Sequence, residues 1–368
     1  MRVVALGEAT HGSREFFLIR HRLLEFLVED LGFTTLAVEA SASASRAVDD
    51  YVQGGSGDPV QALAGLGFWT LHTAEMLSVV QWLRDHNRTA SRKVRFAGID
   101  PQCPAASLDA LRTHLGDDAP GLLGPLAPLA GKRLGVGPPL DRQIEAHARR
   151  VEDFLAGRAA VSDPDDALEH ARIVRQNADL ASRPFRHPDP AQTVSVARDR
   201  YLADNLDLLL ADPNAKVALW AHNGHIMKGS HSGGSVPAMG WHLSRRHGEA
   251  YYALGVLFGE GRFRARRPRF GKVNPAKPPV TFHAPLVQRP MIVEAHLATA
   301  HPGEHVIDLR GGPRPETVNQ WLGEPLQMRS YGAVARRFTY KLSYMPTVLA
   351  EHFDGIAFVP ETTASTPL

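Results

Sequence analysis

A single cysteine, Cys103, occurs among the 368 residues of the chain. One thiol cannot form an internal disulfide, and the sequence does not open on a basic segment followed by an apolar one, so we expect a protein of the reducing cytoplasm. The sequence also lacks an apolar run approaching the roughly 20 residues that cross a bilayer. Its 41 Lys and Arg against 39 Asp and Glu leave a net charge of only +2. These absences disfavour membrane and nucleic-acid partners and favour a small-molecule ligand; nothing in them predicts an oligomeric state.

With 43% hydrophobic residues, a chain of this length can bury a large core. Strand patterns are separated mostly by helical patterns or loops, which is typical of an α/β fold with a largely parallel central sheet flanked by helices. The predicted strands cover residues 2–6, 34–38, 94–98, 216–220, 251–256, 305–309 and 355–359. Arginine is in large excess over lysine, and Ala, Gly and Pro are abundant, as is typical of a GC-rich bacterial genome.

The region 104–212 shows no strand pattern. The expected helices in it cover residues 105–115, 140–155, 165–181 and 190–210, with a Pro- and Gly-rich linker over 118–139. We therefore predict an α/β catalytic core formed by residues 1–103 and 213–368. The helical insertion, residues 104–212, is predicted to lie over the carboxyl ends of the strands and to roof a cleft. The alternative is that these helices cover one face of the sheet.

Glu8 and His11 form the most informative pair in the sequence, because a carboxylate and an imidazole stand three residues apart where a strand ends. The strand at 2–6 precedes them and a helical pattern at 16–31 follows, so both side chains are expected in a strand-to-helix turn. In open α/β sheets, ligands bind at the carboxyl ends of the strands. A neutral histidine takes a proton from water, and a carboxylate on its other nitrogen fixes the tautomer and stabilises the imidazolium. The pair therefore predicts a general base.

Glu39 follows the next predicted strand and supplies a second carboxylate at the same edge. Between the two strands, Arg20 falls inside the apolar stripe of the predicted helix. A buried guanidinium is costly unless a carboxylate or an anionic ligand meets it, so Arg20 is a candidate partner for Glu8, Glu39 or the substrate. The alternative is that Arg20 reaches a carboxylate at the surface.

His222 and His225 follow the strand at 216–220. An H-x-x-H pair outside a confirmed helix is a weak metal signal by itself. Three strand ends that present Glu8 with His11, Glu39, and these two histidines are nevertheless unlikely to arise by chance. We predict that these residues and Arg20 line one cleft at the carboxyl edge of the sheet.

The chain resembles the erythromycin esterase family, and the matching segments are spread over most of its length. They are G-E-A-T-H-G-S-R-E at 7–15, F-F-L-I-R-H at 16–21, L-G-F-T-T-L-A-V-E-A-S at 31–41, F-W-T-L-H-T-A-E at 68–75, F-A-G-I-D at 96–100, A-R-D-R-Y-L-A-D-N at 197–205 and V-A-L-W-A-H-N-G-H at 217–225. Members hydrolyse the lactone ester of macrolide antibiotics without a serine nucleophile, a bound metal or a cofactor, and they use a histidine to activate water.

The resemblance assigns the base to His11 and its orientation to Glu8. It places Arg20, Glu39, His222 and His225 in the family's cleft, and it implies an esterase or lactonase of antibiotic resistance or secondary metabolism. Family members generally carry a few dozen residues before the first strand. This chain opens on that strand, so we expect a more open cleft or an upstream start, and a substrate that the fold does not specify.

Three mechanisms remain open from the residues. Direct attack by water is favoured over an acyl-enzyme, because no G-x-S-x-G nucleophile elbow occurs and Ser41 lacks the strand-Ser-helix setting that such a nucleophile needs. A metal-dependent hydrolase would use His11, His222, His225 and Glu39 as ligands. A biosynthetic enzyme of the same fold would transfer an acyl group or rearrange a product without net hydrolysis.

Overall fold

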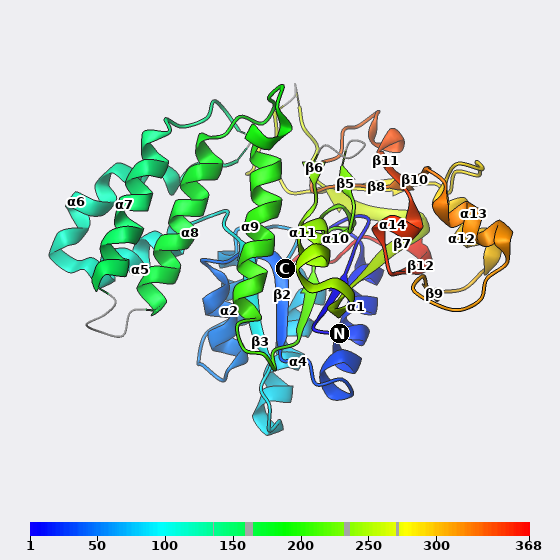
Figure 1. Cartoon of the computed structure of the whole chain (residues 1–368), viewed down its shortest axis with the longest axis horizontal. Helices are drawn as coiled ribbons and strands as arrows, with labels where there is room; N and C mark the ends of the chain where they lie inside the picture. Colours follow the sequence, from blue (N-terminus) through cyan, green and yellow to red (C-terminus); the bar gives the residue numbers. More distant parts are fainter. Residues whose placement is uncertain (135, 159–164, 232–235, 270–271) are drawn as a thin grey trace.

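The structure is a computed structural model that describes residues 1–134, 136–158, 165–231, 236–269 and 272–368. An eight-stranded sheet runs through the centre of the molecule and is flanked by helices (Figure 1). In sheet order its strands are β3 (Arg95–Asp100), β2 (Thr35–Ser41), β4 (Val217–Trp220), β1 (Val3–Leu6), β7 (Tyr251–Ala265), β12 (Gly355–Thr362) and β9 (His305–Asp308), with β8 (Val280–Ala284) paired to β7. The first six are parallel, whereas β8 and β9 pair antiparallel. All seven predicted strands are present, and the predicted α/β fold with a largely parallel sheet is confirmed.

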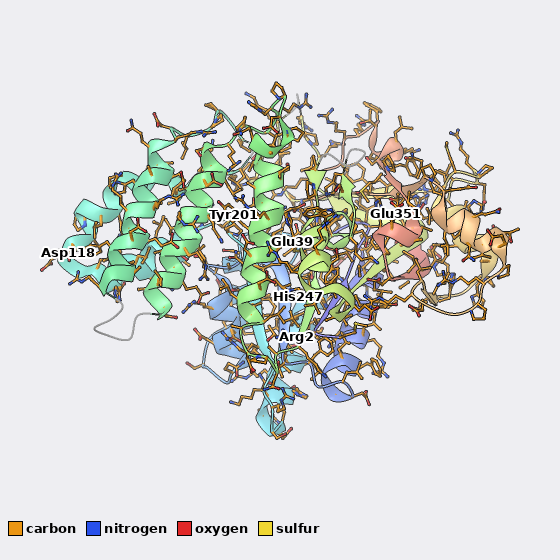
Figure 2. The ribbon with its side chains drawn as sticks, viewed as in Figure 1. Arg2, Glu39, Asp118, Tyr201, His247 and Glu351 are labelled. Atoms are coloured by element: carbon orange, nitrogen blue, oxygen red, sulfur yellow. The ribbon has the colours of Figure 1, made fainter. Side chains whose placement is uncertain are left out.

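The register of the central strands explains why distant motifs meet. Leu6 of β1 pairs with Trp220 of β4 on one side and with Leu254 of β7 on the other, and Trp220 also pairs with Val38 of β2. The residues that follow these positions therefore lie at one edge of the sheet. In Figure 2, Glu39 lies above Arg2, which precedes β1 at the opposite edge.

Helix α1 (Arg14–Glu29), which carries Arg20, buries one side of its surface. The buried residues are Phe16, Phe17, Arg20, Leu24, Leu27 and Val28. The other helices are α2 (Ser45–Val52), α3 (Pro59–Gly65), α4 (Ala74–Thr89), α5 (Ala105–Leu115), α6 (Ala119–Leu123), α7 (Gln143–Arg158), α8 (Asp165–Ser182), α9 (Val194–Leu209), α10 (Asn223–Ile226), α11 (Met239–His247), α12 (Val293–Ala300), α13 (Glu316–Gly323) and α14 (Leu349–His352). Two small ribbons pair β5 (Ser230–His231) with β6 (Val236–Pro237) and β10 (Leu326–Arg329) with β11 (Tyr344–Thr347). In the described part of the chain, no helix has the length and apolarity that a membrane crossing requires.

The helical region has an apolar core of its own. Side chains of α5, α6, α7 and α8 form a cluster separate from that of the sheet, and these helices extend to one side of the molecule in Figure 1. Helix α9 differs, because its Leu202 and Leu206 pack into the core of the sheet. The expected linker at 118–139 contains α6 and short 3₁₀ turns. The helices at 105–209 are thus present, whereas their division from the core as a roof domain stays a prediction.

Candidate active site

Glu8 and His11 lie in the turn between β1 and α1. Glu8 Oε1 lies 2.7 Å from His11 Nδ1. The start of the turn is held on both sides, because the Gly7 N–H donates to the Leu254 carbonyl and the Asn223 N–H donates to the Glu8 carbonyl, each at 2.9 Å. A Cβ on Gly7 would lie 2.0 Å from Asn223 Oδ1, so the close approach to α10 requires glycine. Because the carboxylate occupies Nδ1, Nε2 is the nitrogen of His11 that can accept a proton.

Arg20 is the second partner of Glu8. Its Nη2 donates to Glu8 Oε2 at 2.7 Å, and its Nε donates to the Phe16 carbonyl at 3.0 Å. Only 2% of Arg20 is exposed, and its guanidinium carbon lies 4.7 Å from the centre of the Trp220 ring. The carboxylate that a buried guanidinium needs is therefore Glu8. The alternative of a partner at the surface is wrong.

The charges of these three groups shift one another's pKa values. Burial raises the pKa of Glu8, but the positive charges of Arg20 and His11 outweigh it and hold that pKa below its usual value. Burial lowers the pKa of His11, but the charge and hydrogen bond of Glu8 outweigh it and raise that pKa above 6.5. The neutral, proton-accepting form of His11 therefore predominates only at a pH above this raised pKa.

Glu39 gathers donors from two helices and a turn. Its Oε2 accepts the His222 backbone N–H at 3.0 Å, and its Oε1 lies 2.8 Å from Arg198 Nη2 and 3.2 Å from His225 Nε2. Burial raises the pKa of Glu39, but His225 and Arg198 hold it well below its usual value. Strand β2 continues to Ser41, so Glu39 lies inside the strand and not after it as we expected.

His225 is held between two carboxylates. Its Nδ1 lies 2.5 Å from Asp199 Oδ1, and its Nε2 faces Glu39. Burial lowers the pKa of His225, but Asp199 and Glu39 outweigh it and raise that pKa to about 10. At neutral pH both nitrogens therefore carry protons. The 3.0 Å approach of Arg198 Nη1 to His225 Nε2 is then a contact between two cations, which the carboxylates hold together.

His222 is in the opposite charge state. Burial and the neighbouring charge of His11 lower its pKa to about 3, so it is neutral. Its Nδ1 accepts the Gly224 N–H at 3.1 Å, which places the ring proton on Nε2. That Nε2 is buried and has no hydrogen-bond partner among the described residues. The His222 and His11 rings are 5.1 Å apart between centroids, so an unused N–H donor lies beside the candidate base.

The six predicted residues therefore meet through direct contacts, and three further residues belong to the same network. Arg198 Nε and Nη2 lie 3.0 and 2.5 Å from Asp100 Oδ2, and Asp199 binds His225. Burial raises the pKa of Asp199, but His225 and His231 lower it to about 2. Asp100 closes β3, so the signal that identified Glu39 was present for it as well. Arg198 and Asp199 lie in the segment 197–205 that carries the family resemblance, but they were not assigned to the site, because only the position of α9 brings them to the strand ends.

The described residues of the site include neither a free serine nucleophile nor a set of metal ligands. The Ser41 hydroxyl donates to the Cys103 carbonyl at 3.1 Å and accepts the Ala44 N–H at 3.2 Å, so local backbone groups already occupy it. Within the described ranges, no group of three or more His, Cys, Asp or Glu side chains has a geometry that could hold a metal ion. The ligand set that we considered, His11, Glu39, His222 and His225, is instead spread along the hydrogen-bond network.

A cavity of about 590 Å³ opens beside this network. Arg198, Asp199, His225 and His231 contribute polar groups to it, and the helical region contributes an apolar wall. Its described lining residues are Gln102, Leu134, Phe185, Arg186, His187, Pro190, Thr193, Val194, Ser195, Arg198, Asp199, His225, His231 and Val236. Residues of the helical region and of the sheet region thus face a common space at the strand ends. Of the six residues predicted to line one cleft, His225 alone is among the described lining residues, so that prediction stays a prediction.

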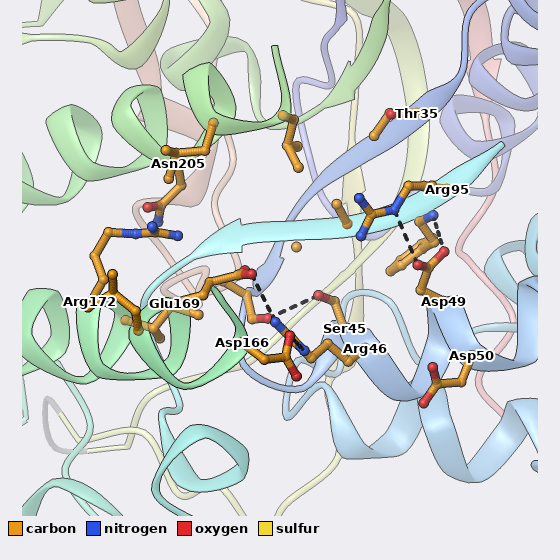
Figure 3. A pocket seen from close by; sticks show the side chains of 18 of the residues that line it. Thr35, Ser45, Arg46, Asp49, Asp50, Arg95, Asp166, Glu169, Arg172 and Asn205 are labelled. Atoms are coloured by element: carbon orange, nitrogen blue, oxygen red, sulfur yellow. Dashed lines mark hydrogen bonds and ion pairs between the residues drawn. The ribbon is translucent and has the colours of Figure 1, made fainter. Parts of the chain in front are cut away.

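Figure 3 shows a second and larger cavity, of about 920 Å³, that lies apart from the predicted site. It lies between α2 and β3 on one side and α8 and α9 on the other. Arg46 of α2 bonds there to Asp166 and, at 2.8 Å, to Glu169 of α8. None of the six predicted site residues is among its described lining residues. Its charged groups pair largely with one another, so we assign it no chemistry.

The chain is similar in sequence to erythromycin esterases. The sequence model of the erythromycin esterase family matches residues 28–362, so the turn with Glu8 and His11 precedes the matched range. Erythromycin esterase type II of Escherichia coli is 29% identical over 301 residues, which cover 73% of this chain and 71% of that protein. Erythromycin esterase type I of Escherichia coli is 27% identical over 279 residues, which cover 67% of each.

Solved structures show the same fold. A succinoglycan biosynthesis protein superposes with a TM-score of 0.79 and 23% identity, over 99% of this chain and 89% of that one. A mutant of erythromycin esterase EreC in its open conformation superposes with a TM-score of 0.71 and 21% identity, over 98% and 91% of the two chains. At these identities the likeness concerns the fold alone.

Proposed function

Because the chain belongs to the erythromycin esterase family, we propose that it hydrolyses an ester or lactone with water activated by His11. Family membership supports an esterase-like hydrolase that acts on a small molecule. The observation that carries the mechanism is the chain of contacts from Arg20 through Glu8 to His11, with 2.7 Å at each step. It leaves the Nε2 atom of His11 able to take a proton, in a network whose other end, at His225, opens on a cavity of ligand size.

The proton path follows from the tautomer. Neutral His11 donates its Nδ1–H to Glu8, and Nε2 takes a proton from water as the water oxygen attacks the ester carbonyl carbon. The Glu8 carboxylate stabilises the imidazolium that forms, and Arg20 keeps that carboxylate ionised. When the tetrahedral intermediate collapses, His11 returns the proton to the leaving alkoxide, so the products are a carboxylic acid and an alcohol.

His222 offers an unused donor beside His11, and we assign it to the developing oxyanion. Protonated His225 and Arg20 are less suited to this role, because both nitrogens of His225 face carboxylates and Arg20 is bonded to Glu8. The Nε2–H of His222 is neutral, buried and unused among the described residues. Such a donor typically contributes about 3–4 kcal/mol to the transition state.

The cavity favours a bulky substrate of low charge. Leu134, Phe185, Pro190, Val194 and Val236 form apolar surface in it, which suits the body of a macrolide or of another natural product. Arg198 adds little attraction for an anion, because Glu39 and Asp100 already compensate its charge. The lining also includes Arg186, which has no ion pair among the described residues, so one cation faces the otherwise largely apolar wall. A site for a phosphorylated or acidic substrate would present several unpaired Arg and Lys side chains.

The proposal is tested with a panel of lactones and simple esters, with the products identified by mass spectrometry. We expect at least one bulky ester to gain the mass of one water molecule in an enzyme-dependent manner. Transfer of the acyl group to another acceptor, or an isomer of unchanged mass, would instead indicate the biosynthetic alternative. A panel without turnover would contradict the esterase.

Chelation separates the water mechanism from the metal-dependent alternative. After exhaustive treatment with a chelator we expect an unchanged kcat, because the pair of Glu8 and His11 can activate water by itself. A zinc hydrolase assayed under the same conditions serves as the positive control. Loss of activity that added Zn²⁺ or Mn²⁺ restores would show that a metal, and not His11 alone, generates the nucleophile.

A further inference from the structure

The start of α1 has no side-chain cap, although a serine stands at the cap position. This serine, Ser13, lies two residues after His11 and makes no side-chain cap hydrogen bond. The first N–H groups of a helix have no partner within the helix and need one from outside. At α1 this partner comes from the far end of the sequence, because the Arg14 N–H donates to the Thr363 carbonyl at 2.9 Å.

The segment 363–368 binds α1 reciprocally. The Thr363 N–H and hydroxyl donate to the Glu15 carboxylate, each at 2.6 Å, while the Thr363 carbonyl accepts the Arg14 N–H. A residue outside the helix thus makes the exchange that a capping box makes inside one.

Helix α4 makes the same exchange three residues further along the segment. The Ala74 N–H donates to the Thr366 carbonyl at 2.9 Å, and the Thr366 N–H donates to Glu75 Oε1 and Oε2 at 3.0 and 3.1 Å. The backbone hydrogen bonds of the segment form two isolated antiparallel bridges, Ser13 with Ala364 and Thr73 with Pro367. One segment therefore ties together the first turns of two helices.

Between these two attachments the segment binds the catalytic turn itself. The Ser365 N–H donates to the Gly12 carbonyl at 2.9 Å, and the Arg264 N–H of β7 donates to the same oxygen at 3.0 Å. A Cβ on Gly12 would lie 2.1 Å from the Arg264 carbonyl, so the turn is pressed against β7. The segment fastens this turn from a second direction, next to His11.

We propose that the segment 363–368 is a positioning strap that holds His11 in register with Glu8 and Arg20. All three groups lie on segments that the strap fastens, namely Glu8 and His11 in the turn and Arg20 on α1. A displacement of about 1 Å in a catalytic group can lower a rate by about 10²-fold. This inference rests on the proposed role of His11 as the base.

A proline at position 365 tests the strap, because it removes the N–H that binds Gly12 and leaves the rest of the segment in place. We expect Ser365→Pro to lower kcat by roughly 10²-fold with KM little changed. Ser365→Ala is the matched conservative variant, because it keeps the N–H and removes a buried hydroxyl that has no partner among the described residues. It should retain full kcat. An equal loss in both variants, or none in either, would overturn the strap.

The titration of His11, followed by NMR, gives a readout that does not need a substrate. The groups that face His11 are Glu8, Glu39, His222 and His225. If the strap keeps His11 on Glu8, Ser365→Pro should lower the pKa of His11 toward 6.5, and Ser365→Ala should not. A His11 pKa that is unchanged in Ser365→Pro would contradict the strap, whether or not the protein hydrolyses an ester. Absence of ester hydrolysis would contradict only the proposed function.

Glu15→Ala is a second variant in case the proline disturbs folding. It removes the acceptor for Thr363 on the partly exposed side of α1. Glu29→Ala, at the exposed last turn of the same helix, is its control. We expect Glu15→Ala to reduce kcat several-fold and to lower the His11 pKa in the same direction. Equal behaviour of the two variants would overturn the strap.

Discussion

Replacing His11 with alanine should lower kcat by roughly 10²–10⁴-fold or more, the largest effect that we expect from a single substitution. The Nε2 atom of His11 is the group that takes the proton from water. The neighbouring histidines cannot take over this role. The Nδ1 atom of His222 already accepts the Gly224 N–H, and His225 lies between two carboxylates with a pKa of about 10. KM should change little, because the cavity beside Arg198 keeps its lining. Steady-state kinetics at several pH values measure both quantities.

Two variants serve as controls for this loss. His301→Ala removes an exposed histidine that is not part of the network and should retain full activity. Ser41→Ala removes a hydroxyl whose partners are the Cys103 carbonyl and the Ala44 N–H, and it should cost little, because no acyl-enzyme is proposed. An acyl group trapped on Ser41, or a His11→Ala enzyme of near-normal kcat, would contradict attack by His11-activated water.

The fold could be predicted because its strands carry a local signal. Residues 2–6, 34–38 and 216–220 are short, largely apolar segments followed within two residues by a polar side chain, and each is a strand of the parallel sheet. The prediction was wrong in length where pairing with other strands extends an element: β7 continues to Ala265 because β12 pairs with it as far as Gly261 and β8 pairs with Gly261–Ala265. The same holds for β2, which continues past Glu39 to pair with β3.

The sequence predicted which residues form the site, but not the protonation state of its histidines. Strand ends of a parallel sheet share an edge, so Glu8, His11, Glu39 and the histidine pair were expected to meet. Nothing local distinguishes His222 from His225, however. The first accepts the Gly224 N–H and stays neutral, whereas the second lies between two carboxylates and is protonated. Asp199 decides this difference, and it is brought there by the packing of a distant helix.

The strap lies beyond any local pattern for the same reason. Thr363 and Thr366 have no feature of a capping residue in the sequence, since a cap is normally sought just before its own helix. Their partners Arg14 and Ala74 are separated from them by most of the chain. The reciprocal hydrogen bonds form only in the folded chain, where the segment after β12 lies beside the starts of α1 and α4.

Replacing Glu8 with glutamine should lower kcat by roughly 10²-fold or more, and raising the pH should not restore it. The wild-type rate should rise with pH through an apparent pKa above 6.5, because only neutral His11 accepts a proton and Glu8 raises its pKa. Removal of the carboxylate charge lowers that pKa, so the rise in the variant should move to lower pH. The pH dependence of kcat/KM in the two proteins measures the shift.

The plateau itself should remain low because of Arg20. Its Nη2 can only donate, so in Glu8→Gln the new amide oxygen would bind Arg20 and the amide NH₂ would point at His11 Nδ1. That nitrogen would then have to accept, and the ring proton would move to Nε2, where the base must be free. Glu25→Gln, on the outer face of α1 where Glu25 pairs with Arg22, controls for the loss of a carboxylate and should leave both plateau and pKa unchanged. A Glu8→Gln enzyme that regains the wild-type plateau at high pH would show that Glu8 acts through its charge alone, and that the tautomer of His11 does not depend on it.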